Sequence, residues 1–174
     1  MRIARARHED LTPLRELAVA TNIDTFGPYN TPENMAVFLK ESYSMERLER
    51  DLGEKGAVIY LAWLDDKLAG FVRLRINDEA SRWLGDNHIE LHRLYVHPDH
   101  QGKKIGSKLM ETALAHASDL GHEWIWLGVW ERNFNAQKFY ASWGFERFAE
   151  HICPVGDDPQ IDWLLRKKIR GPGL

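Results

Sequence analysis

The chain has 174 residues, of which 44% are hydrophobic and 28% charged, and its formal net charge is −3. This length suits one domain over residues 1–174, and the composition is that of a globular protein. The slightly acidic balance argues against nucleic acid as a partner, and the lack of a long apolar run or leader argues against the membrane. Cys153 is the single cysteine, so no internal disulfide can form and we predict a cytoplasmic protein.

The first third of the chain predicts a short strand and three helices. The strand is expected at residues 2–6, and apolar residues at helical spacing begin at Leu11. Thr31 and Ser44 have the residue type and position of helix N-caps. Residues 22–30 contain a Gly-Pro pair and are predicted to be a loop between the first two helices.

The rest of the chain predicts strands that alternate with helices. Residues 57–64 and 67–76 are β-rich and flank Asp65-Asp66, so we expect a hairpin there. Residues 77–86 are polar and expected to be irregular. The elements that follow are a strand at 88–96, a helix from about 104 to 120, a strand at 124–130, a helix at 133–143, and a last hairpin of 145–153 and 161–168 around 156–159.

Residues 91–110 read LHRLYVHPDHQGKKIGSKLM and join a strand to a helix through a polar loop. The first N–H groups of a helix have no partner within it, and the helix dipole adds positive charge, so the junction favours an anion. Gly102 and Gly106 permit a close approach, while Lys103, Lys104 and Lys108 add charge. The spacing fits neither a nucleoside triphosphate loop nor a dinucleotide fingerprint. An ordinary turn with solvated lysines is the alternative interpretation.

A second motif begins at Asn133 and reads NFNAQKFYASWGF. Taken alone, its Tyr140 would be interpreted as a core aromatic. The two motifs in this order resemble those of the GNAT acetyltransferases, and the predicted order of elements matches that fold. In the family the pattern Gln/Arg-x-x-Gly-x-Gly/Ala binds the pyrophosphate of acetyl-CoA. Gln101, Ile105 and Gly106 stand in its places, whereas Lys104 replaces a family glycine.

The resemblance implies an α+β, three-layer GNAT fold, with a central, mostly antiparallel, seven-stranded mixed sheet and helices on both faces. It implies acetyl-CoA as co-substrate and no metal, and the spacing of the eight histidines completes no metal site. In this fold the strand at 88–96 splays from the next strand, and the pantetheine arm pairs with its free edge. The implied acetyl-CoA contacts are Leu94, Tyr95, Val96, Gln101, Gly102, Lys103, Lys104, Ile105, Gly106, Ser107, Asn133, Ala136 and Tyr140.

The resemblance also implies two catalytic residues. Tyr140 would give its proton to the departing CoA thiolate, since a phenol of pKa about 10 matches a thiol near 8.5. Glu90 is the candidate base that deprotonates the amine, because several members carry a catalytic Glu at this distance before the splayed strand ends. His92 is the alternative base, and a solvated strand carboxylate is the alternative interpretation of Glu90.

Two further sequence features bear on the base. Strand alternation would place Glu90, His92, Leu94 and Val96 on one face, unless a bulge intervenes. Some family members use a Glu in the strand after the helix, but that place is Gly128 here, which removes one rival to Glu90.

Residues 24–35, DTFGPYNTPENM, and residues 126–133, WLGVWERN, resemble the PaiA-type bacterial acetyltransferases, which modify spermidine and spermine. This resemblance implies a polyamine as the small-amine partner. The acceptor side would then be formed by residues 22–35 and 77–86, whose carboxylates are Asp24, Glu33, Asp78 and Glu79 among others. The rivals are another small amine, a protein N-terminus, or a non-catalytic acetyl-CoA-binding regulatory module. The sequence leaves a homodimer open.

Overall fold

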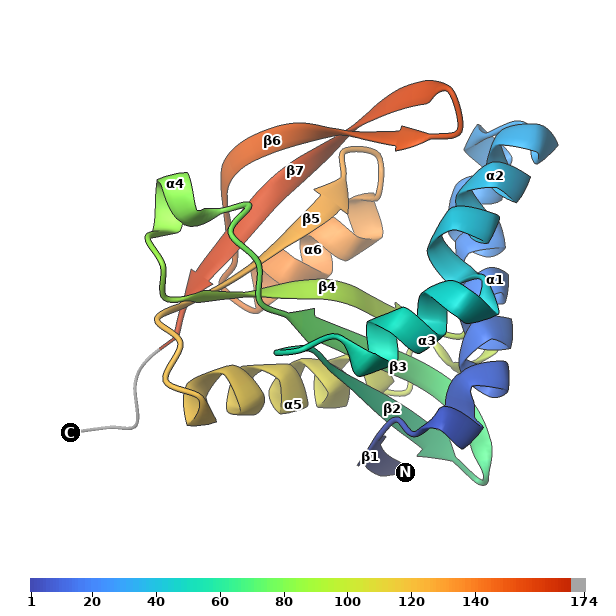
Figure 1. Cartoon of the computed structure of the whole chain (residues 1–174), viewed down its shortest axis with the longest axis horizontal. Coiled ribbons are helices and arrows are strands. Elements are labelled where there is room, and N and C mark those ends of the chain that lie inside the picture. Colours follow the sequence, from blue (N-terminus) through green and yellow to red (C-terminus); the bar gives the residue numbers. More distant parts are fainter. Residues whose placement is uncertain (170–174) are drawn as a thin grey trace.

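The structure is a computed structural model that describes residues 1–169. Over this part of the chain, one seven-stranded sheet has the order β1-β2-β3-β4-β5-β7-β6, in which only β4 and β5 run parallel (Figure 1). This confirms the predicted α+β, mostly antiparallel mixed sheet. The strands are β1 Arg2–Arg5, β2 Val58–Leu64, β3 Lys67–Arg75, β4 His88–Val96, β5 Trp124–Trp130, β6 Glu146–Val155 and β7 Asp158–Lys168.

The helices begin at the predicted caps. The Thr31 side chain accepts a hydrogen bond from the Asn34 N–H, and that of Ser44 accepts one from the Arg47 N–H, as N-caps do. The helices are α1 Leu11–Phe26, α2 Pro32–Tyr43, α3 Met45–Gly53, α4 Ser81–Leu84, α5 Ile105–Asp119 and α6 Phe134–Ser142, with 3-10 turns at His8–Asp10, Gly27–Tyr29 and Pro98–His100.

Helices cover both faces of the sheet, as predicted (Figure 1). One core lies between the sheet and α5, with Leu109 at its centre, and a second core lies under α1 and α3, with Leu14 and Leu48 buried in it. Gly70 in β3 permits the close fit of α5, because a Cβ there would lie 2.9 Å from the Tyr95 carbonyl and 3.1 Å from a Leu109 methyl. The strand β4 lies between the two cores, with Leu91 in the first and Tyr95 packed against the second.

Three predicted boundaries are wrong. Residues 22–26 are not a loop, because α1 continues to Phe26, with Asn22 buried and its amide donating to the Ala18 carbonyl at 2.7 Å. No glycine or proline interrupts that stretch until Gly27. Residues 77–86 include the short helix α4. The last hairpin turns tightly at Gly156-Asp157, so β6 and β7 run further than predicted on either side.

The strands β4 and β5 pair over three residues and then part. His88, Ile89 and Glu90 pair with Trp124, Ile125 and Trp126, and beyond them no pairing joins these two strands. The rest of β4, residues 91–96, therefore has a free edge on this side. This is the splay that the sequence resemblance predicted.

A bulge in β4 overturns the predicted alternation. Arg73 of β3 pairs with Arg93, whereas the next residue, Leu74, pairs with Leu91, so His92 is the extra residue of a β-bulge. Ile89 and Leu91 face the α5 core, and after the bulge Leu94 and Val96 do so as well. Glu90 consequently lies on the opposite face from Leu94 and Val96, because the bulge shifts the alternation by one residue.

Candidate active site

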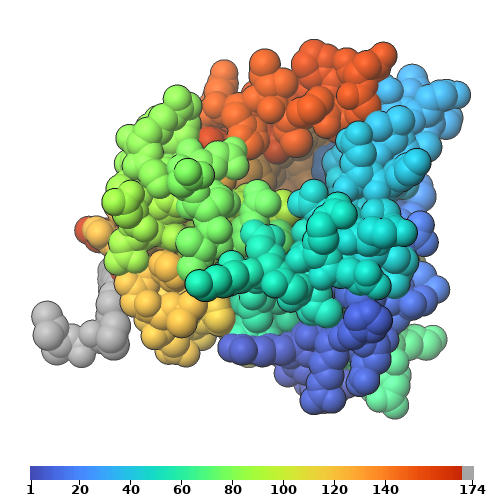
Figure 2. All heavy atoms as spheres, viewed as in Figure 1, coloured from blue at the N-terminus to red at the C-terminus, as the bar shows by residue number. Residues whose placement is uncertain are grey.

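A cleft of about 1050 Å³ opens where β4 and β5 part. Its lining comes from the free edge of β4, the start of α5, the ends of α1 and β5, the first turns of α6, and the inner face of the β6–β7 hairpin. In Figure 2 the surface is hollowed below that hairpin, between α4 and α2. The fold thus brings together segments that are far apart in the sequence.

The predicted site residues gather in this cleft, with one exception. Lys103 does not line it; its side chain is exposed, and its Nζ lies 3.3 Å from His100 Nδ1. The residues that do line the cleft are Glu90, Leu94, Tyr95, Val96, Gln101, Gly102, Lys104, Ile105, Gly106, Ser107, Asn133, Ala136 and Tyr140.

The loop before α5 presents the helix N-terminus to the cleft. Gly102 and Lys104 both have left-handed backbones, with φ of 77° and 61°. Lys104 is the N-cap residue and α5 begins at Ile105, so the next N–H groups have no partner inside the helix. Lys104 therefore has a positive φ at the position where the GNAT pattern has glycine. Such a conformation costs an L-residue about 1–2 kcal/mol.

Replacing Lys104 by Gly is expected to leave acetyl-CoA affinity within tenfold and to stabilise the fold by up to about 1 kcal/mol. The gain arises because glycine adopts a positive φ without strain, offset by its larger loss of entropy on folding. Thermal unfolding and calorimetric titration with acetyl-CoA measure both quantities. A loss of affinity above tenfold would show that the Lys104 ammonium contacts the phosphates directly.

The second motif places Asn133 and Tyr140 in the lining of the cleft. Asn133 caps α6, and its Oδ1 accepts a hydrogen bond from the Ala136 N–H at 3.1 Å. Tyr140 is 7% exposed and belongs to the core against α5, where it packs on Phe139 and Phe145, while it also lines the cleft. Burial raises the pKa of Tyr140 well above its ordinary value. The phenol therefore keeps its proton at neutral pH.

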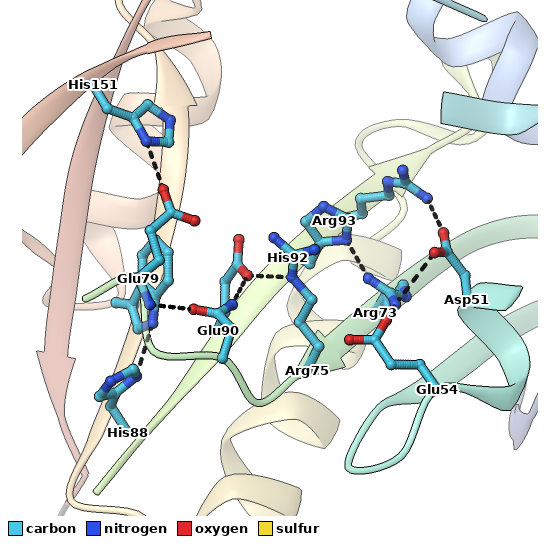
Figure 3. Close-up of polar contacts among 12 residues, drawn as sticks. Asp51, Glu54, Arg73, Arg75, Glu79, His88, Glu90, His92, Arg93 and His151 are labelled. Atoms are coloured by element: carbon cyan, nitrogen blue, oxygen red, sulfur yellow. Dashed lines mark hydrogen bonds and ion pairs between the residues drawn. The ribbon is translucent and has the colours of Figure 1, made fainter. Parts of the chain in front are cut away.

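Glu90 is held in a fixed orientation by two donors. Its Oε2 accepts hydrogen bonds from Arg75 Nε and Asn77 Nδ2, each at 2.5 Å, and the carboxylate is 6% exposed (Figure 3). Asn77 Oδ1 in turn accepts from the Glu79 N–H at 2.9 Å. Burial raises the pKa of Glu90, although the Arg75 guanidinium opposes that rise. Glu90 thus brings a buried, oriented carboxyl group to the cleft.

His92 lies in a cationic environment. Arg73 Nη1 lies 2.5 Å from His92 Nδ1, and Arg73 itself is fully buried with ion pairs to Asp51 and Glu54 (Figure 3). Burial and the nearby arginines, Arg93 first among them, lower the pKa of His92 well below its ordinary value. The ring is neutral, and its Nδ1 lone pair faces a guanidinium. This geometry disfavours His92 as the base.

Sequence reasoning missed the wall of the cleft that the last hairpin forms. His151 and Asp162 are cross-strand partners in β6 and β7, and both line the cleft with Cys153. His151 Nδ1 lies 2.8 Å from Glu79 Oε1. The spacing of these residues carries no motif, and the only available signal was the alternation of polar residues along two strands whose register was unknown.

The part of the cleft that was predicted to face the acceptor also carries aromatic rings. Phe26 and Tyr29 lie against Trp130, with ring centroids 5.3 Å and 5.0 Å apart. Of the carboxylates predicted on this side, Asp24 and Glu79 line the cleft, whereas Glu33 and Asp78 are exposed and do not.

This cleft suits a ligand that is anionic in one part and extended in another. The N–H groups that begin α5 can receive a phosphate, and the free edge of β4 offers backbone groups to an amide chain. Among residues 1–169, no three His, Cys, Asp or Glu side chains are grouped to hold a metal ion, and no helix is long and apolar enough to cross a membrane. Such a cleft can hold an extended ligand that carries phosphate at one end, as coenzyme A does.

Comparison with known proteins gives the family. Residues 16–145 match the model of the Acetyltransferase (GNAT) family, and the chain belongs to it. An uncharacterized N-acetyltransferase of Lactobacillus delbrueckii subsp. lactis, from the pepI 3′ region, is 35% identical over 97% of this chain and 98% of its own length. The protein is accordingly a GNAT N-acetyltransferase whose co-substrate is acetyl-CoA.

A sequence match and a structure match both come from Thermoplasma acidophilum. A spermidine N(1)-acetyltransferase is 29% identical over 92% of each chain. The crystal structure of a PaiA N-acetyltransferase in complex with coenzyme A superposes with a TM-score of 0.78 at 27% identity, covering 96% of this chain and 98% of that one.

Proposed function

We propose that the protein transfers the acetyl group of acetyl-CoA to a primary amine of a polyamine such as spermidine or spermine, in the cytoplasm. The observation that carries this proposal is the acceptor side of the cleft. The same cleft is lined by the carboxylates of Asp24, Glu79, Glu90 and Asp162 and by the aromatic rings of Phe26, Tyr29 and Trp130. Such a lining suits a flexible chain with several ammonium groups. The similarity to a spermidine acetyltransferase supports it.

The chemistry needs a neutral amine and an acid for the leaving thiolate. An aliphatic ammonium has a pKa near 10.4, so neutralising it at pH 7 costs roughly 4–5 kcal/mol. Tyr140, which keeps its proton, would donate it to the CoA thiolate as the C–S bond breaks. The backbone N–H groups of β4 near Val96 would stabilise the oxyanion, a contribution often worth about 3 kcal/mol.

Transfer is proposed to be direct, without an acetyl-enzyme intermediate. The one thiol in the cleft lining is that of Cys153, and burial together with the adjacent Asp162 raises its pKa to about 12. Because the thiolate is the nucleophile, a thiol that stays protonated is a poor acceptor of the acetyl group. The amine nitrogen would therefore attack the thioester carbon itself.

Turnover of a panel of amines with acetyl-CoA, followed by release of CoA, tests the proposal. Spermidine should be acetylated, and its KM should rise between low and high salt more steeply than that of a monoamine. The reason is that attraction between remote ammonium groups and the carboxylates weakens as the Debye length shortens. A salt-insensitive KM would favour another small amine or a protein N-terminus. Tight CoA binding without turnover of any amine would indicate a regulatory module.

A further inference from the structure

His151 is held between two carboxylates on the wall of the cleft. Its Nδ1 lies 2.8 Å from Glu79 Oε1, in the loop that precedes α4, and its Nε2 lies 3.7 Å from Asp162 Oδ2 on β7 (Figure 3 shows the contact with Glu79). The side chain is 35% exposed and lines the cleft. One ring nitrogen is thus fixed by a hydrogen bond, and the other is open.

Gly128 lies beside this pair of side chains. A Cβ built there would lie 3.4 Å from Asp162 Oδ2 and 3.7 Å from His151 Nε2. Gly128 is in β5, at the place where the strand has parted from β4. A methyl group at position 128 would make ordinary contacts with both, and a longer side chain there would meet the imidazole and the carboxylate.

Three other titratable side chains of the cleft, Glu90, His92 and Cys153, have surroundings different from those of His151. The Oε2 of Glu90 is occupied by Arg75 and Asn77, and the Nδ1 of His92 faces Arg73. Cys153 keeps its proton. His151 has carboxylates at both nitrogens, an environment that favours acceptance of a proton.

We propose that His151 is the residue that takes the proton from the acceptor ammonium, with Asp162 and Glu79 as positioning residues; this role rests on the proposed function. The 3.7 Å between Nε2 and Asp162 Oδ2 is too long for a hydrogen bond. An ammonium nitrogen at about 2.9 Å from each atom would donate to both. Glu79 would fix the tautomer by accepting from Nδ1–H, which leaves the Nε2 lone pair for the substrate.

One N–H bond of the ammonium breaks and its proton bonds to Nε2, leaving the lone pair on the amine nitrogen. That pair forms the new C–N bond with the thioester carbon, and the C–S bond breaks with its electrons on sulfur. The thiolate takes the Tyr140 proton, and the excess proton on the amide nitrogen is relayed by water to the Tyr140 phenolate, which restores the phenol. His151 returns its own proton to water. The products are the acetylamide, CoA and one proton.

The charges that face His151 set the direction of its pH dependence. They are Asp162 on β7, Glu79 from the loop before α4 and, on its own strand, the protonated Cys153; Gly128 on β5 adds none. Asp162 and then Glu79 raise the pKa of His151 above its ordinary value despite partial burial. A base must be unprotonated, so kcat/KM should fall as pH drops through that raised pKa.

The variant His151→Gln tests the role, because a glutamine amide can still donate to Glu79 but cannot accept a proton. We expect kcat for spermidine to drop by about 10²-fold or more, with acetyl-CoA affinity and thermal stability nearly unchanged. The acidic limb of the pH profile should disappear. His8→Gln is the matched control, since His8 is exposed near α1 and outside the cleft lining, and it should behave as the wild type.

Two further variants separate this role from a structural one. Asp162→Asn removes the leading cause of the raised pKa, so the acidic limb should move to lower pH. Glu90→Gln should raise the KM of the acceptor and leave the limb in place. The proposal is overturned if His151→Gln keeps the wild-type pH profile. It is also overturned if Glu90→Gln is the variant whose pH profile loses its acidic limb. Wild-type protein without turnover of any amine would instead overturn the proposed function.

Discussion

Replacing Gly106 by Asp is expected to abolish acetyl-CoA binding. Gly106 lies in the first turn of α5 and lines the cleft, where the unpaired N–H groups and the helix dipole favour an anion. A carboxylate there would repel the pyrophosphate by about 4 kcal/mol per pair of unit charges at 4 Å, with an effective dielectric constant of 20. That energy corresponds to roughly a thousandfold loss of affinity.

Gly106→Ala is the matched control for this variant. A Cβ at position 106 would lie 3.6 Å from Phe139 and 3.7 Å from Val96, which are ordinary contacts, so a methyl group fits the folded protein. Calorimetric titration should therefore find acetyl-CoA bound by Gly106→Ala and unbound by Gly106→Asp. A folded Gly106→Asp protein with wild-type affinity would show that the phosphates lie elsewhere.

The parts of the site that were predicted from the sequence depend on local signals. The loop before α5 was found because Gly102, Gly106 and the lysines adjoin a helix start, and Asn133 and Tyr140 belong to one short motif. N-caps at Thr31 and Ser44 likewise fixed two helix starts. In each case the residues that determine the structure are neighbours in the chain, so their spacing carries the information.

The parts that were missed depend on contacts between distant segments. The bulge at His92 is set by the register of β3 against β4, and Arg73 is fully buried there among Asp51, Glu54 and His92. Nothing in the spacing of β4 reveals that register, so the predicted alternation failed at one residue.

The polar wall of the last hairpin was missed for the same kind of reason. His151 meets Asp162 only because β6 and β7 pair in one register, and it meets Glu79 only because the loop before α4 folds over this wall. The residues proposed to meet the acceptor come from such distant pairs, whereas the residues predicted to contact the cofactor come from contiguous motifs. Spacing along the chain can indicate a contiguous motif and cannot indicate a pair that only the register of two strands brings together.

Replacing Tyr140 by Phe is expected to lower kcat about 10²-fold or more, with little change in acetyl-CoA affinity. The ring packing on Phe139 and Phe145 is kept, and only the hydroxyl that would protonate the thiolate is lost. Because burial raises the pKa of Tyr140 above its ordinary value near 10, the wild-type enzyme should lose no activity through this group below about pH 10.

Tyr60→Phe is the matched control for the loss of a phenol hydroxyl. The Tyr60 hydroxyl lies 3.1 Å from His116 Nδ1, and neither residue lines the cleft, so turnover should remain at the wild-type level. Steady-state kinetics with spermidine, together with calorimetric titration of acetyl-CoA, separate lost chemistry from lost binding. Because Tyr140 is buried in the core against α5 as well as lining the cleft, equal turnover in Tyr140→Phe would mean that it serves there only as a packed aromatic.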